Sequence, residues 1–364
     1  MRVLLINTVP TEPNGITNVI FNYQSHVNAS KITFDSVSIN RPSPKYVNLI
    51  EEKNGVVFIV ERSAKRIFRY IIQLKDIIKK NKYDIVHIHT NSHTVVLELL
   101  AAKWGRCPVR IVHVHNTTCN SVLLHKLLTP LFNVLYTHAL ACGEDAGRWM
   151  FGDRPFKVLH NGVDVEKYAF NNEKRIKVRN ELNVEFGDVL LTHVGAFNEQ
   201  KNHVFLIEIF KELSKRSPKY RLLLIGDGYL RPTIEENIEE YGLRNRVVFT
   251  GNIDNVSDYL NGADFIIMPS LYEGLPLTLI EQQANGLKCV VSDTITEEAD
   301  LTNTMTFISL DSSICDWGDI IERISLPVSR ENQSRDNIKM IKEKGYSIQN
   351  EAIVLEKYYT DAIK

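Results

Sequence analysis

The sequence of 364 residues lacks several features that mark common protein classes. Its five cysteines are odd in number and form no C-x-x-C pair, so we expect free thiols in a reducing compartment rather than a disulfide framework. No apolar run approaches the ~20 residues of a membrane-spanning helix, and the first residues lack the long apolar segment of a signal peptide. We therefore expect a cytoplasmic chain that is soluble or lies peripherally on a membrane.

An excess of charge of one sign is also absent, because 43 Lys and Arg balance 44 Asp and Glu. This balance argues against a dedicated nucleic-acid-binding protein. It hides an asymmetry, since residues 1–165 carry 20 Lys and Arg against 12 Asp and Glu, whereas the rest carry 23 against 32. Together with the length, the asymmetry predicts two domains with different partners.

Short β-branched apolar runs alternate with amphipathic helical stretches along both halves of the chain. Such alternation predicts an α/β protein with two doubly wound parallel sheets. The runs lie at 3–6, 32–39, 56–60, 84–89, 109–114, 140–141, 157–159, 189–194, 220–225, 246–249, 265–268, 289–292 and 305–308. The boundary is expected near 161–164, before a polar stretch at 171–179. We expect an N-terminal domain over 1–165, a C-terminal domain over 166–345, and a helix within 346–364 that returns to the first domain.

The most informative segment follows the run 265–268. Gly274 lies in a loop, and Pro276 suits the first turn of a helix, where its missing N–H costs nothing. The main-chain amides around Gly274–Leu277 would then form an anion site. Glu273 before the helix and Glu281 within it could bind hydroxyls on two parts of a ligand whose phosphates rest on the helix start, as in a nucleotide-sugar. The spacing also fits an ordinary helix start with acidic residues near the positive end of its dipole.

This segment resembles the E-x7-E motif of retaining GT-B glycosyltransferases of family 4, with Glu273 and Glu281 as the two glutamates. Further segments resemble that family in its order. They are the glycine loop at 7–15, the H-x-H-N-T segment at 113–117, the junction segment at 160–164, the phosphate loop at 194–202 and the G-D-G segment at 226–228. The resemblance is nearest to bacterial capsule and exopolysaccharide transferases.

The resemblance implies a GT-B fold, in which two Rossmann-like domains face a cleft. The first domain would bind the acceptor and the second the donor. The implied reaction moves a hexose from a nucleotide-sugar, expected to be UDP-linked, to a sugar hydroxyl of a lipid-linked saccharide in surface polysaccharide synthesis. It would retain the anomeric configuration and need no cofactor and no metal, which agrees with the lack of any D-x-D motif.

Roles for individual residues also come from the resemblance. His115 would contact the donor hexose near the reacting centre, with Glu273 on the same sugar. Lys201 would pair with the diphosphate, beside the amides of Gly274, Leu275 and Leu277, and Glu281 would bind the ribose. Gly15 would face the reacting centre and the acceptor.

Two positions depart from the family pattern. Ala196 stands where an arginine is usual, which removes one phosphate cation, and Asn14-Gly15 stands where many relatives have two glycines. Ala196 keeps open a non-catalytic partner subunit with the same fold. A nucleotide-sugar hydrolase or epimerase is a further alternative. A dehydrogenase is disfavoured, because Arg231 occupies the third glycine position of a dinucleotide fingerprint.

Residues 62–82 form a basic amphipathic segment with eight Lys or Arg and one Asp. Its apolar positions are Ile67, Ile71, Leu74 and Ile78. The segment predicts a helix that either packs on the sheet with a solvated outer face or lies on an anionic membrane surface. Both can hold together. An anionic surface would suit a lipid-linked acceptor.

Overall fold

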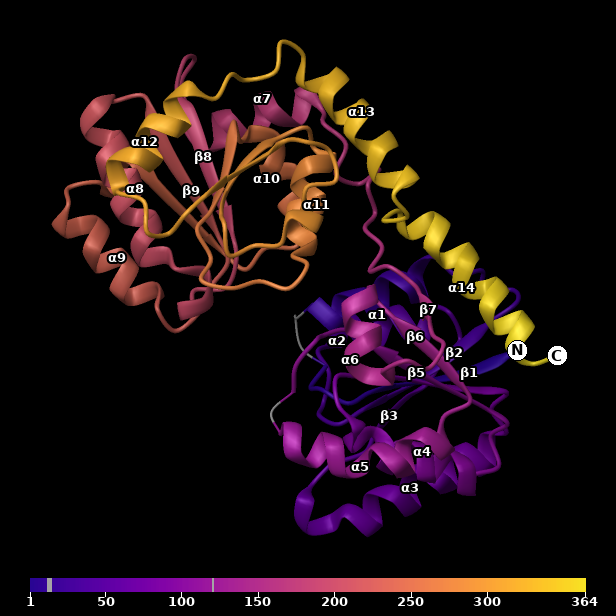
Figure 1. The fold of residues 1–364 in the computed structure, drawn as a ribbon. Coiled ribbons are helices and arrows are strands. Elements are labelled where there is room, and N and C mark those ends of the chain that lie inside the picture. Colours follow the sequence, from indigo (N-terminus) through magenta and orange to yellow (C-terminus); the bar gives the residue numbers. More distant parts are fainter. Residues whose placement is uncertain (12–14, 120) are drawn as a thin grey trace. The chain divides into compact units, whose positions relative to one another are not determined.

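The computed structural model describes the whole chain except residues 12–14 and 120 and the side chain of Ala64. The chain forms two compact units (Figure 1). Unit 1 comprises residues 1–162 and 345–364, and unit 2 comprises residues 163–344. The glycine loop expected at 7–15 lies partly outside the described residues, and Asn14 is among the positions left out.

Unit 1 contains a parallel sheet of seven strands in the order β3-β2-β1-β4-β5-β6-β7. Its strands consist mostly of β-branched and other apolar residues. The central strands β1, β4 and β5 are buried on both faces, as expected for a parallel sheet covered by helices. The strands are β1 (Arg2–Asn7), β2 (Thr33–Ser38), β3 (Val57–Ile59), β4 (Ile85–Thr90), β5 (Val109–Val114), β6 (His138–Ala141) and β7 (Lys157–Val158).

Two groups of helices cover this sheet. The first is α1 (Gly15–His26) with α14 (Ile348–Ala362), whose side chains face Leu5, His87 and His113; α2 (Pro44–Glu51) packs on α1. The second packs on the face that carries Leu4 and Ile6. Its members are α3 (Ile67–Asn81), α4 (Val96–Trp104), α5 (Val122–Leu135) and α6 (Glu144–Phe151). No helix in the described part of the chain is long and apolar enough to span a membrane.

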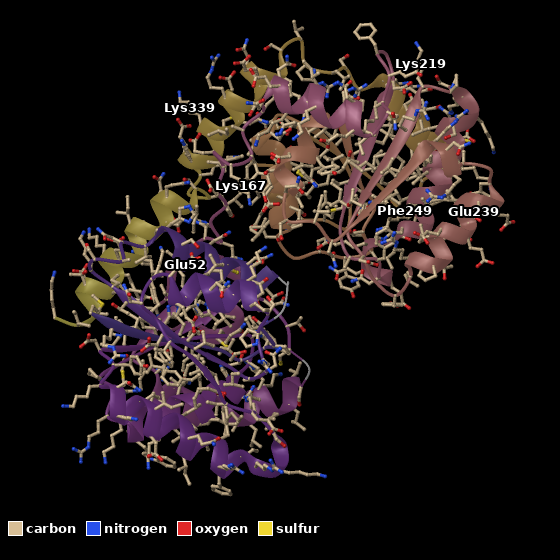
Figure 2. All side chains as sticks on the ribbon, turned by 180° about the vertical axis from the view of Figure 1, so that it is seen from behind. Glu52, Lys167, Lys219, Glu239, Phe249 and Lys339 are labelled. Atoms are coloured by element: carbon tan, nitrogen blue, oxygen red, sulfur yellow. The ribbon has the colours of Figure 1, made fainter. Side chains whose placement is uncertain are left out.

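Unit 2 contains a parallel sheet of six strands in the order β10-β9-β8-β11-β12-β13. The strands are β8 (Val189–Val194), β9 (Tyr220–Ile225), β10 (Val247–Gly251), β11 (Phe265–Met268), β12 (Lys288–Ser292) and β13 (Met305–Ile308). One face packs on α8 (His203–Arg216), α9 (Arg231–Glu240) and α12 (Ile314–Arg323). The other helices are α7 (Asn172–Glu181), α10 (Val256–Gly262), α11 (Leu277–Ala284) and α13 (Arg330–Glu343). Side chains fill the space between sheet and helices in both units (Figure 2).

The polar stretch at 171–179 is not an open connection but belongs to α7. Asn171 caps this helix, since its side chain accepts a hydrogen bond from the Lys174 amide at 2.9 Å. Arg175 and Arg179 both bond to the buried Asp264, at 2.5 and 2.9 Å. Buried charges need such partners. The two arginines of α7 therefore hold this helix against the start of β11.

Candidate functional site

Three loops follow β8, β9 and β11 at the carboxyl edge of the unit 2 sheet, where ligands bind in parallel α/β folds. The loops after β8 and β9 are joined by main-chain hydrogen bonds. The Gly195 amide donates to the Ile225 carbonyl and the Phe197 amide to the Asp227 carbonyl, both at 3.0 Å. The edge therefore has a fixed backbone before any ligand binds.

Glycine is required where these two loops touch. A Cβ on Gly226 would lie 2.1 Å from the Gly195 carbonyl oxygen, and one on Gly228 would lie 2.5 Å from the Phe197 oxygen. Gly226 also has a φ of +135°, which residues with side chains rarely adopt. A Cβ on Gly274 or Gly15 would meet no atom of the described residues within 4 Å. The protein itself therefore leaves room for a side chain at these two positions.

This contrast gives a prediction about stability. We expect Gly226→Ala to lower the free energy of unfolding by ~2–4 kcal/mol, because the change adds both a clash and backbone strain. Gly274→Ala should cost less than ~1 kcal/mol. Urea denaturation of the two variants beside the unchanged chain measures both values. Equal losses in the two variants would contradict the contact between the β8 and β9 loops.

A partly buried ion pair links the β8 loop to the β11 loop. Lys201 Nζ lies 2.5 Å from Glu273 Oε1, and the two side chains are 14% and 8% exposed. Gln200 Nε2 donates to Glu273 Oε2 at 3.2 Å and to the Tyr272 carbonyl at 3.0 Å. The structure thus brings together two residues predicted to act on one ligand. Gln200 is not recognisable from the sequence, because a single glutamine beside a lysine forms no pattern.

The β11 loop leads into α11, which begins at Leu277. Pro276 is the N-cap residue of this helix (φ −75°, ψ 106°), so it precedes the first turn in which the sequence had suggested it would lie. Among the described residues, no hydrogen bond occupies the main-chain N–H of Leu275 or Leu277. These donors lie at the positive end of the helix dipole and beside the Lys201–Glu273 pair, which suits a phosphate group.

Glu281 lies within α11 and turns to another partner. Its carboxyl group forms a hydrogen bond with the buried Tyr168 hydroxyl. Burial raises the pKa of Glu281 to about 7, although Tyr168 and Lys167 act against this rise. Glu273 and Glu281 are thus held by different neighbours. Tyr168 was not identified from the sequence, where the only hint is its position just after the junction segment.

His115 follows β5 at the carboxyl edge of the unit 1 sheet. Its Nε2 lies 2.8 Å from Nδ1 of His89, and its Nδ1 lies 3.2 Å from Oδ1 of Asn161. The His115 amide also donates to Oδ1 of Asn91 at 3.2 Å. Burial lowers the pKa of His115 to about 4, so the ring is neutral near pH 7. Gly15 begins α1, which follows β1 at the same edge of the sheet.

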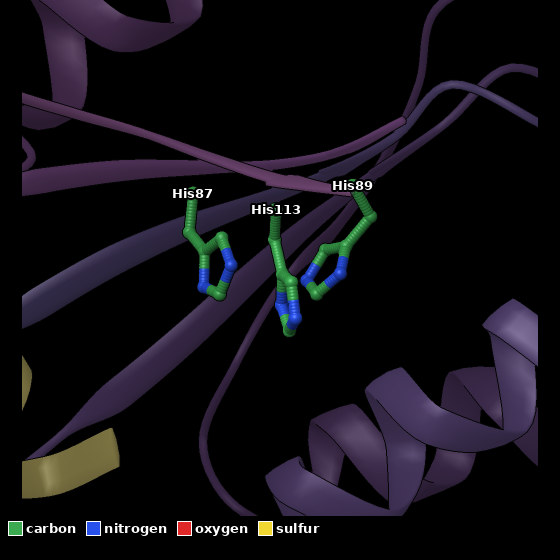
Figure 3. A group of neighbouring side chains, drawn as sticks. All are labelled: His87, His89 and His113. Carbon is green, nitrogen blue, oxygen red and sulfur yellow. The ribbon is translucent and has the colours of Figure 1, made fainter. Parts of the chain in front are cut away.

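Three further histidines lie next to one another on the unit 1 sheet (Figure 3), and the rings of His89 and His113 contact that of His115. His87 and His89 come from β4 and His113 from β5, and all three are buried. Their ligand atoms lie within 4.8 Å of one another, so by composition they could hold a metal ion. The His87 ring stacks on the rings of His89 and His113, with interplanar angles of 26° and 19°, whereas the His89 and His113 rings are tilted by 40°.

Each of the two units matches a known protein family. The family described as "Glycosyl transferases group 1" matches residues 174–340, and "Glycosyltransferase Family 4" matches residues 13–167. A protein of Bacillus subtilis (strain 168) that carries the name glycosyltransferase EpsF is 32% identical, over 85% of this chain and 84% of its own length. The chain belongs to the family 4 glycosyltransferases.

One further relative of this glycosyltransferase and one solved structure carry more specific names. The UDP-Gal:alpha-D-GlcNAc-diphosphoundecaprenol alpha-1,3-galactosyltransferase of Escherichia coli is 32% identical, over 61% of each chain. The crystal structure of Anabaena HepE in complex with UDP superimposes with a TM-score of 0.80 at 16% identity, over 99% of this chain and 100% of that one. This similarity shows the GT-B fold. Lys201, Gly274, Leu275, Leu277, Glu273 and Glu281 lie in unit 2, and His115 and Gly15 lie in unit 1.

Proposed function

We propose that this glycosyltransferase moves a hexose from a UDP-sugar to a sugar hydroxyl of a lipid-linked saccharide during surface polysaccharide synthesis, with retention of the anomeric configuration. The observation that carries the proposal is the partly buried Lys201–Glu273 pair beside the start of α11. The choice of donor and acceptor is supported by the name of the Escherichia coli relative, which contains a UDP-sugar donor and a diphosphoundecaprenol acceptor. HepE was crystallised with UDP-glucose.

In this proposal, different groups of unit 2 bind the ribose, the diphosphate and the hexose of the donor. Glu281 accepts hydrogen bonds from the ribose hydroxyls, and the amides of Leu275 and Leu277 bind the diphosphate. Lys201 neutralises the diphosphate, while Glu273 keeps a carboxylate oxygen for a hexose hydroxyl. Gly274 lets the donor approach the backbone, since a Cβ there would point into open space. In unit 1, His115 contacts the transferred sugar and Gly15 leaves room for the acceptor.

Transfer then follows without a nucleophile from the protein. The acceptor oxygen forms a bond to the anomeric carbon on the face from which the diphosphate departs. The bond from that carbon to the diphosphate oxygen breaks, and the acceptor proton moves to the departing oxygen. Lys201 and the amides at the start of α11 stabilise the negative charge that develops there, so the rate enhancement is mainly electrostatic.

The test is a thermal-shift screen of UDP-, GDP- and ADP-sugars, followed by transfer to a lipid-linked saccharide with the best donor. We expect stabilisation by a UDP-sugar, release of UDP that depends on acceptor, and a product whose anomeric signals in NMR match those of the donor. UDP release without an acceptor and without a glycoside product would indicate a hydrolase. Inversion at the anomeric carbon would contradict the proposed stereochemistry.

A non-catalytic partner subunit is the second candidate, and Ala196 favours it. Ala196 is exposed in the β8 loop, where the family usually supplies a phosphate cation. A subunit of this kind would bind UDP-sugars but release no UDP with any lipid-linked acceptor. Ala196→Arg tests whether the missing cation abolishes transfer, because it adds an arginine at an exposed position and fills no core site. Transfer by the unchanged chain excludes this candidate, and transfer only by Ala196→Arg supports it.

We also propose that unit 1 rests on an anionic membrane surface through α3, α4 and α5. Figure 1 shows these helices side by side, and α4 contacts both of the others. The expected basic segment is formed by η1 (Ala64–Arg66) and α3, whose buried side carries Ile71, Leu74 and Ile78. Its outer side exposes Phe68 together with Lys65, Arg69, Lys79 and Lys80. The helix can therefore pack on the sheet and still present cations.

The apolar part of this surface comes mainly from α5. Its exposed apolar residues are Val122, Leu123, Leu124, Leu127, Leu131 and Val134. Acidic side chains are scarce nearby, since no Asp or Glu occurs between Glu98 and Glu144. The single acidic residue of α3, Asp76, pairs with Lys75 at 2.9 Å. Exposed leucines among cations suit the interface of an anionic bilayer.

Replacing leucines of α5 should release the protein from membranes. Leu123 and Leu127 are 81% and 73% exposed, so Leu123→Ser with Leu127→Ser should leave the fold intact. We expect binding to vesicles with about 30% phosphatidylglycerol to fall by about tenfold or more. Co-sedimentation measures it, with Phe186→Ser, an exposed apolar position of unit 2, as the matched control. If the α5 variant instead converts a dimer to a monomer and leaves vesicle binding unchanged, a second copy of the chain covers this surface.

The raised pKa of Glu281 predicts a pH dependence of donor binding. The carboxylate accepts hydrogen bonds from both ribose hydroxyls, whereas the protonated acid accepts them less well. With a pKa of about 7, we expect affinity for a UDP-sugar to fall about tenfold between about pH 8 and about pH 6. A UDP-sugar is the right probe, since its diphosphate has no group that titrates in this range. Glu281→Gln should bind weakly with a flat profile, and an unchanged profile in that variant would contradict the assignment.

Protonation of Glu281 also affects folding. Burial disfavours the charged form in the folded state, so this carboxyl group has a higher pKa in the folded than in the unfolded chain. Its contribution to stability is therefore greatest below its unfolded pKa and is lost as the pH rises through about 7. Donor binding and stability of the free protein thus respond to this carboxyl group in opposite directions.

A further inference from the structure

We infer that His89 is a positioning residue, which donates its Nδ1–H to Nε2 of His115 and so fixes the tautomer and the orientation of that ring. The inference rests on the proposed role of His115 in transfer. His89 lies on β4, is 3% exposed, and comes within 2.8 Å of the His115 ring nitrogen. The two ring centroids are 5.1 Å apart, with the ring planes 19° apart.

The hydrogen-bond partners of His115 set the direction of the protons. Asn161 presents its oxygen to His115 Nδ1 at 3.2 Å, and an amide oxygen can only accept. His115 Nδ1 therefore carries the proton, and Nε2 of the same neutral ring carries a lone pair. The group facing this lone pair is Nδ1 of His89, which must therefore donate. The chain of donors runs from His89 to His115 to Asn161.

This chain holds His115 from three sides. Both ring nitrogens are bonded within unit 1, and the main-chain N–H is bonded to Asn91. A ring held in this way has no free choice of rotamer or tautomer when a sugar arrives. Such preorganisation avoids the cost of ordering the group during the reaction. Without His89, the 3.2 Å bond to Asn161 is the one remaining hydrogen bond of the ring nitrogens among the described residues. We expect the His115 ring then to rotate away from Asn161 and to move its proton to Nε2.

The neighbouring histidines do not replace His89. The His113 ring contacts those of His89 and His115 at tilts of 40° and 38°, with ring centroids 5.2 and 4.2 Å apart. Neither of its ring nitrogens has a hydrogen-bond partner among the described residues. His87 bonds through Nδ1 to the Tyr359 hydroxyl at 2.5 Å. His89 is thus the member of the buried cluster in Figure 3 whose hydrogen bond reaches His115.

The direct test is nitrogen-resolved NMR of the full chain with isotope-labelled histidine. We expect His115 in the unchanged protein to carry its proton on Nδ1, and to move it to Nε2 in His89→Phe. His89→Asn should restore the Nδ1 proton, because the amide of asparagine can place an N–H near the position of His89 Nδ1. His113→Phe is the matched control, since it changes the same cluster without removing a hydrogen bond to His115. A proton on Nε2 of His115 in the unchanged protein would overturn the inference.

Kinetics give the second readout. In His89→Phe we expect kcat to fall about tenfold or more while KM for the UDP-sugar changes less than about twofold, because the nucleotide groups lie in unit 2. His89→Asn should recover most of kcat. If His115→Ala retains full turnover, the proposed role of His115 fails, and the tautomer measurement alone decides the role of His89. A shift of the His89 and His113 nitrogen signals on adding Zn²⁺ would identify a metal site and overturn the inference.

Discussion

Glu281→Ala should raise the Kd for UDP-sugars by about 30- to 100-fold, the largest effect on binding that we expect from a single side chain. The reason is the loss of the ribose hydrogen bonds to a charged acceptor. A net loss of ~2–3 kcal/mol, within the range for one such bond, corresponds to this change in Kd. Isothermal titration calorimetry on the full chain measures it. Turnover at saturating donor should fall much less, because Glu281 is proposed to bind the nucleotide in ground and transition states alike.

Tyr168→Phe is the matched control for this result. It removes the hydroxyl that bonds to Glu281 but leaves the carboxyl group in place. We expect it to raise the pKa of Glu281 further, because the hydrogen bond lowers that pKa, and to weaken donor binding by only a few-fold near pH 8. His115→Ala provides the opposite pattern, with reduced kcat and nearly unchanged Kd. Unchanged affinity in Glu281→Ala would remove Glu281 from the donor site.

The strands and the family were accessible from the sequence because each depends on local pattern. Buried parallel strands appear as short β-branched runs, and β5, β8, β9, β11 and β13 have the predicted bounds. The GT-B fold and membership of the family 4 glycosyltransferases are confirmed. The helices α7 and α13 are harder to identify from the sequence. Most of their residues are polar and few are buried, so they lack a clear apolar face.

The contacts of the site depend on residues that are distant in the sequence. Lys201 and Glu273 are 72 positions apart, and His89 and His115 are 26 apart. No local pattern states that Lys201 is already paired with Glu273, or that His115 uses both ring nitrogens within unit 1. Motifs therefore predicted which residue types gather at the carboxyl edges. The partners that fix the charges and proton positions of these residues could be identified only from the fold.

The Lys201–Glu273 pair predicts the largest effect on turnover. Lys201→Met should lower kcat about 100- to 1,000-fold, the loss typical when a group that stabilises developing negative charge is removed. It should also destabilise the protein by ~1–3 kcal/mol, because the Glu273 side chain, which is only 8% exposed, is left without its cation. Reduced activity in this variant alone would therefore not separate catalysis from folding.

Adding Glu273→Gln to Lys201→Met separates the two effects. The glutamine removes the unpaired charge and can still accept a hydrogen bond from Gln200, so we expect most of the lost stability to return. The kcat should stay low, because the cation that neutralises the leaving diphosphate is still missing. Urea denaturation and steady-state transfer assays on the single and double variants measure both quantities. Recovery of kcat together with stability would mean that Lys201 supports the loops rather than the departing diphosphate.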